Sequence, residues 1–213
     1  MSTLLDRVVG RCGELVLRRD DDGHHEVIAN GVFLMDTRNG ESERLLVTAA
    51  ADRMPAAGHV LIGGLGVGFS LRAAVEHPRV RRITVVERES AVIRWAVEHL
   101  SHVTAGALDD PRLTVVEADL VEHLHGPGPR FDAICLDIDN GPHWTVTEGN
   151  RRLYDDSGLD AVRRRLTDRG VLAVWSAAAV PEFEAVLRTR FDDVEVLAVA
   201  VMRGEPDTVL VAQ

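Results

Sequence analysis

The segment HVLIGGLGVGFSLRAAVEHPRVRRITVVE, residues 59–87, decides the fold of this chain. It begins with a short apolar run at residues 60–62, continues through a glycine-rich turn, and ends in a second apolar run that stops at Glu87. Short apolar runs bounded by glycine are typical of buried strands, and residues 69–75 between them favour a helix. The order strand, glycine turn, helix, strand and acid predicts one βαβ unit with a nucleotide site.

The glycines of this turn form the predicted floor of the nucleotide site. They are Gly63, Gly64, Gly66 and Gly68. Glycine lets the backbone approach a ligand where a Cβ would collide, and the start of the following helix offers free N–H groups. Glu87, about twenty residues further on, is placed to hold the two hydroxyls of a ribose.

Two classes of nucleotide-binding fold use such a unit. The dinucleotide fingerprint of nicotinamide and flavin proteins has its third glycine one position later, where this chain has Phe69. The spacing from Gly64 to Gly68 is closer to that of S-adenosylmethionine-binding proteins. We therefore favour an S-adenosylmethionine-type site and keep a nicotinamide oxidoreductase as the lesser alternative.

Composition restricts the class of protein. The 213 residues fit one α/β domain with a small appendage, and 34 acidic against 24 basic residues give a net charge of −10, which disfavours nucleic acid as a partner. Cys12 and Cys135 are too few for a disulfide framework, and the adjacent His24 and His25 lack the spacing of a metal site. Without a long apolar segment or a signal peptide, we expect a cytoplasmic protein with no metal and no membrane contact.

The chain divides into two predicted regions. Residues 14–36 carry hairpin signals and precede a helix at residues 41–51, so we place a small N-terminal β region with its linking helix at residues 1–52. Residues 53–213 form the predicted nucleotide-binding catalytic domain. The last two strands, expected at 194–201 and 208–211, are too close for a crossover helix and must pair antiparallel.

These elements predict the fold class. It is α/β, with a methyltransferase-like, Rossmann-type seven-stranded sheet closed by an antiparallel C-terminal hairpin. A small N-terminal β-hairpin appendage precedes it.

Two further acids follow predicted core strands, and the carboxyl ends of parallel strands share one edge of a sheet. Asp119 is placed to accept a hydrogen bond from an adenine amino group, with the backbone beside Leu120 framing the ring, or else to cap the next helix. Asp137 is placed near the reacting centre as an electrostatic partner or general base, or else caps a loop.

The loop after Asp137 is rich in polar side chains. Asp139 and Asn140 are candidates for binding the substrate, and His143 is a candidate second catalytic base. Trp144 is a candidate lid or cation-facing wall.

Together these motifs resemble the spermidine synthase family. The resemblance covers about residues 59–212 and rests on the segments 63–100, 131–142, 153–166 and 170–175. Members have a small β domain followed by a methyltransferase-like domain, and they transfer an aminopropyl group from decarboxylated S-adenosylmethionine to a polyamine, commonly as dimers or tetramers. The resemblance implies that Glu87 binds the ribose, that Asp119 contacts the adenine, and that Asp137 is the catalytic acid.

The chain also departs from the family pattern. The family's glycine turn carries an acid where this chain has Gly66, and that acid holds the aminopropyl ammonium. The family loop Asp-x-x-Asp-Pro is altered, since residues 140–141 are Asn-Gly and Asp139 comes one position early. The family's N-terminal Gln and its Tyr-His-Glu cluster fall at Leu34 and at residues 41–44, Glu-Ser-Glu-Arg. The residues predicted to bind the nucleotide therefore match the family pattern better than those predicted to bind the substrate.

We therefore expect a homodimeric transferase that binds S-adenosylmethionine or its decarboxylated form and alkylates a small acceptor, an amine in our first hypothesis. Because the aminopropyl anchors are missing, methyl transfer is favoured over aminopropyl transfer. The alternatives are aminopropyl transfer in polyamine synthesis and a non-catalytic nucleotide-binding dimer.

Overall fold

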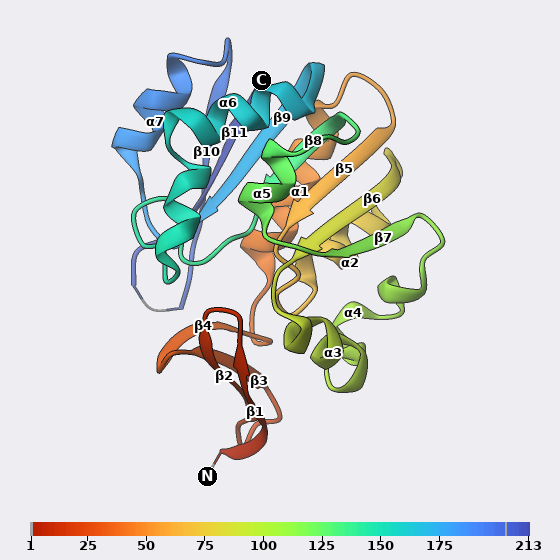
Figure 1. Cartoon of the computed structure of the whole chain (residues 1–213), viewed down its shortest axis with the longest axis vertical. Coiled ribbons are helices and arrows are strands. Elements are labelled where there is room, and N and C mark those ends of the chain that lie inside the picture. The colour runs from red at the N-terminus through yellow and green to blue at the C-terminus, as the bar shows by residue number, and fades with distance from the viewer. Residues whose placement is uncertain (1, 203) are drawn as a thin grey trace.

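In the computed structural model, which describes residues 2–202 and 204–213, a small sheet precedes a larger one along the chain (Figure 1). The small sheet is an antiparallel meander of β1 (Thr3–Gly10), β2 (Gly13–Arg19), β3 (His25–Ala29) and β4 (Val32–Asp36). The two hairpins predicted within residues 14–36 are present as β2–β3 and β3–β4. β1 is an additional edge strand that the sequence did not predict, because charged residues interrupt its apolar pattern and its Leu4 and Val9 are exposed.

The larger sheet has the predicted topology. Its strands are β5 (Gly58–Gly63), β6 (Val80–Glu87), β7 (Leu113–Glu117), β8 (Phe131–Leu136), β9 (Leu166–Ser176), β10 (Val194–Val199) and β11 (Asp207–Ala212). They follow the order β10-β11-β9-β8-β5-β6-β7. β11 pairs antiparallel with both β10 and β9, whereas the pairs from β9 to β7 are parallel. The predicted seven-stranded sheet with an antiparallel C-terminal hairpin is confirmed.

Helices cover both faces of this sheet (Figure 1). One apolar cluster contains residues of α1 (Glu41–Arg53), α2 (Phe69–Glu76) and α3 (Ser90–Glu98), and the other contains residues of α5 (Leu120–His125), α6 (Asp156–Arg165) and α7 (Pro181–Arg188). Strand β5 shows the division, because Val60 and Ile62 belong to the first cluster and Leu61 to the second. Burial on both faces explains why the core strands are apolar runs without alternation.

Short helical segments complete the described chain. They are α4 (Ser101–Thr104) and the 3₁₀ turns η1 (Ala107–Asp109) and η2 (Glu148–Leu153). Among the helices of residues 2–202 and 204–213, none combines the length and apolar character that crossing a membrane requires.

The small sheet is fixed to the larger domain by carboxylates. Glu89, just after β6, accepts hydrogen bonds from the backbone N–H groups of Arg11 and Cys12, at 2.9 and 3.3 Å. Asp6 on β1 accepts a hydrogen bond of 2.8 Å from the indole of Trp95 on α3. These contacts hold the β1–β2 turn beside the carboxyl end of β6, where the sequence predicts the nucleotide site.

Helix α1 joins the two regions. It begins beside the small sheet and packs on β8, β9 and β11 of the larger one. A domain boundary near residue 52 remains a prediction.

Candidate active site

The glycine turn after β5 has the backbone conformation that its sequence predicts. The φ angles of Gly64, Gly66 and Gly68 are +91°, +55° and +101°, in the region that side chains disfavour. A Cβ on Gly64 would lie 2.3 Å from the backbone oxygen of Asp137. The Asp137 N–H donates to the carbonyl of Gly63 at 2.9 Å. The turn and Asp137 are therefore packed side by side at the carboxyl edge of the sheet.

Glu87 supports this turn through its carboxylate. The backbone N–H of Leu65 donates to Oε2 at 2.9 Å, and that of Glu89 donates to Oε1 at 2.8 Å. Burial raises the pKa of Glu87, against the lowering effect of these hydrogen bonds. Each carboxylate oxygen keeps a second lone pair. Glu87 can thus fix the turn and still accept a hydrogen bond from a ligand.

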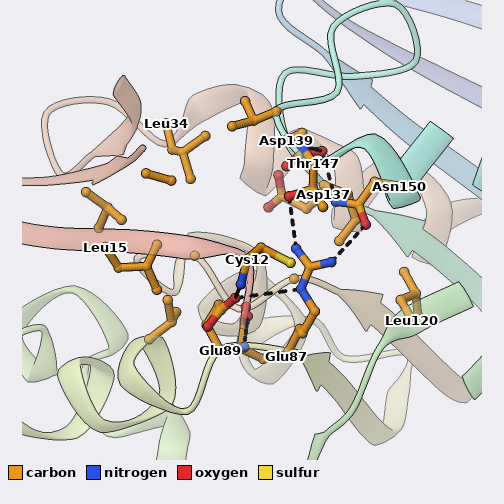
Figure 2. Close-up of a pocket in the computed structure, with 18 of the residues that line it drawn as sticks. Cys12, Leu15, Leu34, Glu87, Glu89, Leu120, Asp137, Asp139, Thr147 and Asn150 are labelled. Atoms are coloured by element: carbon orange, nitrogen blue, oxygen red, sulfur yellow. Dashed lines mark hydrogen bonds and ion pairs between the residues drawn. The ribbon is translucent and has the colours of Figure 1, made fainter. Parts of the chain in front are cut away.

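A cavity, here called the donor cavity, lies between the small sheet and the carboxyl edge of the larger one. Figure 2 shows Leu15 and Leu34 from the small sheet on one side, and Cys12 from the β1–β2 turn beside Glu87 and Glu89. Half of the predicted site residues line the same cavity, namely Gly64, Gly66, Glu87 and Leu120 from the nucleotide set, the catalytic candidate Asp137 and the substrate candidate Asp139. Asn150 and Thr147 close it from the loop after β8 (Figure 2).

Asp119 caps helix α5, which is one of the two roles expected from the sequence. Its Oδ1 accepts a hydrogen bond of 3.1 Å from the N–H of Glu122. Its Oδ2 lies 3.6 Å from Nη1 of Arg88, a residue that the sequence analysis did not single out. The guanidinium of Arg88 lines the donor cavity and donates to Thr147 Oγ1 and Asn150 Oδ1, at 3.1 and 3.4 Å. Arg88 thus links the end of β6 to the loop that follows β8.

We expect Arg88→Met to speed amide hydrogen exchange in residues 144–150 by about tenfold or more. The variant keeps a long side chain and removes two hydrogen bonds from a charged donor, a loss of roughly 1.5–3 kcal/mol each at most. Exchange followed by mass spectrometry measures the effect. Arg72→Met is the matched control, because it removes an exposed ion pair with Glu76. Equal exchange in the two variants would show that Arg88 does not hold the loop.

A second cavity, here called the acceptor cavity, adjoins the first through Gly66, Asp137 and Asp139. Three further acids line it: Asp36 on β4, which is paired with Arg38, Glu43 in the first turn of α1, and Asp207 at the start of β11. Its aromatic lining residues are Phe33, Phe69, Trp144 and Trp175. In the described part of the chain, no ion pair reaches Glu43, Asp137 or Asp207.

These acids alter one another's protonation. Burial, together with the charge of Asp137, raises the pKa of Glu43 to about 7. Burial also raises the pKa of Asp137 to about 6, with contributions from Asp207 and Glu87. The Ser70 hydroxyl donates to Asp137 Oδ2 at 2.6 Å and lowers this pKa. Asp137 is therefore a carboxyl group that can take up a proton near neutral pH.

The sequence analysis named Glu43 only as part of a stretch that departs from the family, and it did not name Asp207. A topological signal was present for both. A helix that leads into the first strand begins at the carboxyl edge of the sheet, and so does a strand that runs antiparallel to the others. Glu43 and Asp207 occupy these two starting positions.

The structure separates the predicted residues of the loop after β8. Asp139 lines both cavities and accepts hydrogen bonds from Thr147 N–H and Asn150 Nδ2. Asn140 is buried, and Trp144 is 60% exposed at the rim of the acceptor cavity. His143 is exposed, and its Nε2 lies 3.1 Å from Glu182 on α7. The structure therefore does not bring His143 together with Asp137.

The chain matches a known protein family over more than half of its residues. The family model described as the spermine/spermidine synthase domain matches residues 41–192. The match includes α1 with Glu43, the glycine turn, Glu87 and the loop after Asp137.

Three curated relatives of the chain are named polyamine aminopropyltransferases. The chain is 34% identical over 136 residues to polyamine aminopropyltransferase 1 of Pseudomonas aeruginosa, a match of 63% of this chain and 45% of that protein. It is 32% identical over 167 residues to the polyamine aminopropyltransferase of Mycobacterium tuberculosis, covering 77% of this chain and 31% of the relative. The polyamine aminopropyltransferase 1 of Streptomyces coelicolor is 34% identical over 122 residues, which are 56% of this chain and 22% of that protein. The matches thus span less than half the length of these relatives.

Solved structures share the fold over the whole chain. A spermidine synthase crystallised in complex with the transition state analogue AdoDATO superposes with a TM-score of 0.83 at 20% identity, covering 99% of this chain and 73% of the other. Spermidine synthase from Thermotoga maritima gives a TM-score of 0.79 at 19% identity, covering 99% and 72%. The small N-terminal sheet is therefore included in the shared fold.

Proposed function

The chain belongs to the spermine/spermidine synthase domain family, and from this premise we propose that it transfers an aminopropyl group from decarboxylated S-adenosylmethionine to an amine of a small acceptor. One observation carries the proposal. Glu43, Asp137 and Asp207 line one cavity, and within the described residues no basic side chain pairs with them. Such a cavity attracts cationic amines.

This proposal changes the preference that the sequence analysis gave. Methyl transfer was favoured there because Gly66 replaces the acid that would hold the ammonium of the aminopropyl group. The names of the curated relatives favour the aminopropyl alternative. The cavity supports it too, because its carboxyl groups give it negative charge although position 66 is a glycine.

In the proposed reaction, the acceptor nitrogen forms a bond to the propyl carbon beside the sulfonium. The carbon–sulfur bond breaks, its electron pair stays on sulfur as a neutral thioether, and the acceptor amine loses one proton. Asp137 takes this proton as general base, since its pKa is raised to about 6 by burial. Ser70 orients the carboxylate through its 2.6 Å hydrogen bond.

The donor cavity would hold the nucleotide part of the donor. In this proposal the glycine turn contacts the donor, Glu87 binds the ribose hydroxyls, and Leu120 packs against the adenine. Asp119 contributes through the helix that it caps, and Trp144 covers the acceptor side. The homodimer and the cytoplasmic location expected from the sequence remain predictions.

We expect Glu87→Ala to lower donor affinity by a factor of about 30 or more. The variant loses charge-assisted hydrogen bonds to the ribose, and such a loss costs on the order of 2 kcal/mol. It also frees the N–H of Leu65, which Glu87 holds in the glycine turn. Calorimetry with decarboxylated S-adenosylmethionine measures the change. Glu117→Ala is the matched control, because Glu117 is the register partner of Glu87 on the adjacent strand and its side chain is 45% exposed. Near wild-type affinity in a folded Glu87→Ala protein would remove Glu87 from the site.

A product assay tests the proposed function. The purified chain is incubated with S-adenosylmethionine or its decarboxylated form and a panel of mono-, di- and triamines, and products are identified by mass spectrometry. We expect an aminopropylated amine together with the thioether product. A methylated amine would instead support methyl transfer. Donor binding without any product would favour the non-catalytic alternative.

A further inference from the structure

The hydroxyl of Ser42 lies between two carboxyl groups. Its Oγ is 2.9 Å from Oε2 of Glu43 and 2.7 Å from Oδ2 of Asp207. The Ser42 side chain is buried, so water does not readily supply a substitute partner. Because a hydroxyl has one hydrogen, Ser42 can donate to only one of the two carboxyl groups.

The second short contact therefore needs a hydrogen from a carboxyl group. If both carboxyl groups were ionised, the Ser42 oxygen would lie within 3 Å of one carboxylate oxygen with no hydrogen between the two atoms. If one group is protonated, its O–H donates to Ser42, and Ser42 donates to the other carboxylate. This arrangement satisfies both contacts with a single added proton.

The surroundings favour this protonation. Asp137, just after β8, raises the pKa of Glu43, and Glu87 in turn raises the pKa of Asp137. Burial raises the pKa of Glu43 to about 7, and it also raises that of Asp207 against the lowering effect of the Ser42 hydroxyl and the Trp175 indole. The remaining charged residues that line the cavity are Asp36, Arg38 and Asp139, and Arg38 is already paired with Asp36, Asp20 and Glu26. Arg44, next to Glu43 on α1, lies over the ring of Phe69.

We propose that Ser42 and Asp207 are acceptor-specificity residues, which with Glu43 hold one shared proton in the free protein and exchange it for an ammonium group of a diamine acceptor. The inference rests on the proposed function. Asp137 meets the reacting amine, and the bridged pair Glu43–Asp207 meets the second amine from another wall of the same cavity. When the ammonium group binds, the carboxyl proton passes to the solvent, and both carboxylates face the cation.

The exchange predicts a measurable proton release. The full chain is titrated with 1,4-diaminobutane by calorimetry at pH 7 in two buffers of different ionisation enthalpy, and 1-aminobutane serves as the ligand with one amine. For the wild type we expect release of up to about one proton per diamine bound, together with at least tenfold tighter binding of the diamine than of the monoamine. Affinity for the diamine should rise with pH between about 6 and 8, because deprotonation of the pair then costs less.

The Asp207→Asn variant tests the shared proton independently of the other groups in the site. The amide has the same shape and donates an N–H to Ser42, so Ser42 can donate to an ionised Glu43 and no added proton is needed. We expect this variant to release no proton, to lose the preference for the diamine, and to bind 1-aminobutane as the wild type does. Glu205→Gln is the matched control, because it removes a negative charge from the same β10–β11 turn at an exposed position.

An infrared measurement tests the proton without a ligand. The carbonyl stretch of a protonated carboxyl group should be present in the free wild type and in Glu205→Gln at pH 7, and reduced in Asp207→Asn. An unchanged band, or unchanged proton release in Asp207→Asn, would overturn the inference even if aminopropyl transfer is observed. If the wild type neither transfers an aminopropyl group nor binds amines, the proposed function fails, and the infrared band still reports whether the pair holds a proton.

Discussion

Asp137→Asn should lower turnover by a factor of about 10² to 10⁴ and change donor affinity by no more than a few-fold. The amide fills the same volume and can still bond to Ser70, but it cannot accept the proton that the acceptor amine releases. Its position supports this expectation, because Asp137 lines both the donor and the acceptor cavity. Turnover with the best amine of the panel and calorimetry with the donor measure the two quantities.

The pH dependence of the reaction provides a second measurement on the same residue. Asp137 must be ionised to act as a base, so kcat/KM should rise with pH through about 6, the raised pKa of its carboxyl group. The Ser70 hydroxyl lowers this pKa, so Ser70→Ala should move the rise to higher pH and recover most of its activity there. An Asp137→Asn protein as active as the wild type would leave Asp137 a structural residue of the loop.

The fold could be predicted from the sequence because its signals are local and strong. Apolar runs without alternation mark strands that are buried on both faces, and the short spacing of the last two strands requires an antiparallel pair. β1 gave no such signal, since a half-exposed edge strand with charged residues differs little from a loop. The predicted helix at residues 41–51 is present as α1 and extends to Arg53.

The sequence predicted those residues of the candidate site that a single topological rule could locate. Residues that directly follow parallel strands meet at one edge, and this rule found the glycine turn, Glu87 and Asp137. It could not find Glu43 or Asp207, because these begin a helix and an antiparallel strand. It also could not decide the role of Asp119, which depends on the local geometry of α5 and on the neighbouring guanidinium of Arg88.

The acids of the acceptor cavity should also determine which donor the protein binds. We expect the protein to bind decarboxylated S-adenosylmethionine at least tenfold more tightly than S-adenosylmethionine at pH 8. The two donors differ by one carboxylate, which would enter a cavity that holds Glu43, Asp137 and Asp207. At pH 8 Glu43 is mostly ionised, since its pKa is about 7. Two unit charges about 4 Å apart interact by about 4 kcal/mol at an effective dielectric constant near 20, and about 1.4 kcal/mol already gives a tenfold difference.

A glycine at position 66 would by itself favour the opposite preference, because without a side chain the turn exposes backbone N–H groups that could bind the carboxylate of S-adenosylmethionine. The structure weakens that argument, since Met35 packs against Gly66 and the nearby side chains are acidic. Paired calorimetry with both donors decides between the two. Glu43→Gln should shrink the preference several-fold, and it should do so more at pH 8 than at pH 6, where Glu43 is already protonated. Glu41→Gln, exposed in the same first turn of α1, is the control that should leave the ratio unchanged. A wild-type preference for S-adenosylmethionine would instead support methyl transfer, because the acids would then not determine which donor enters.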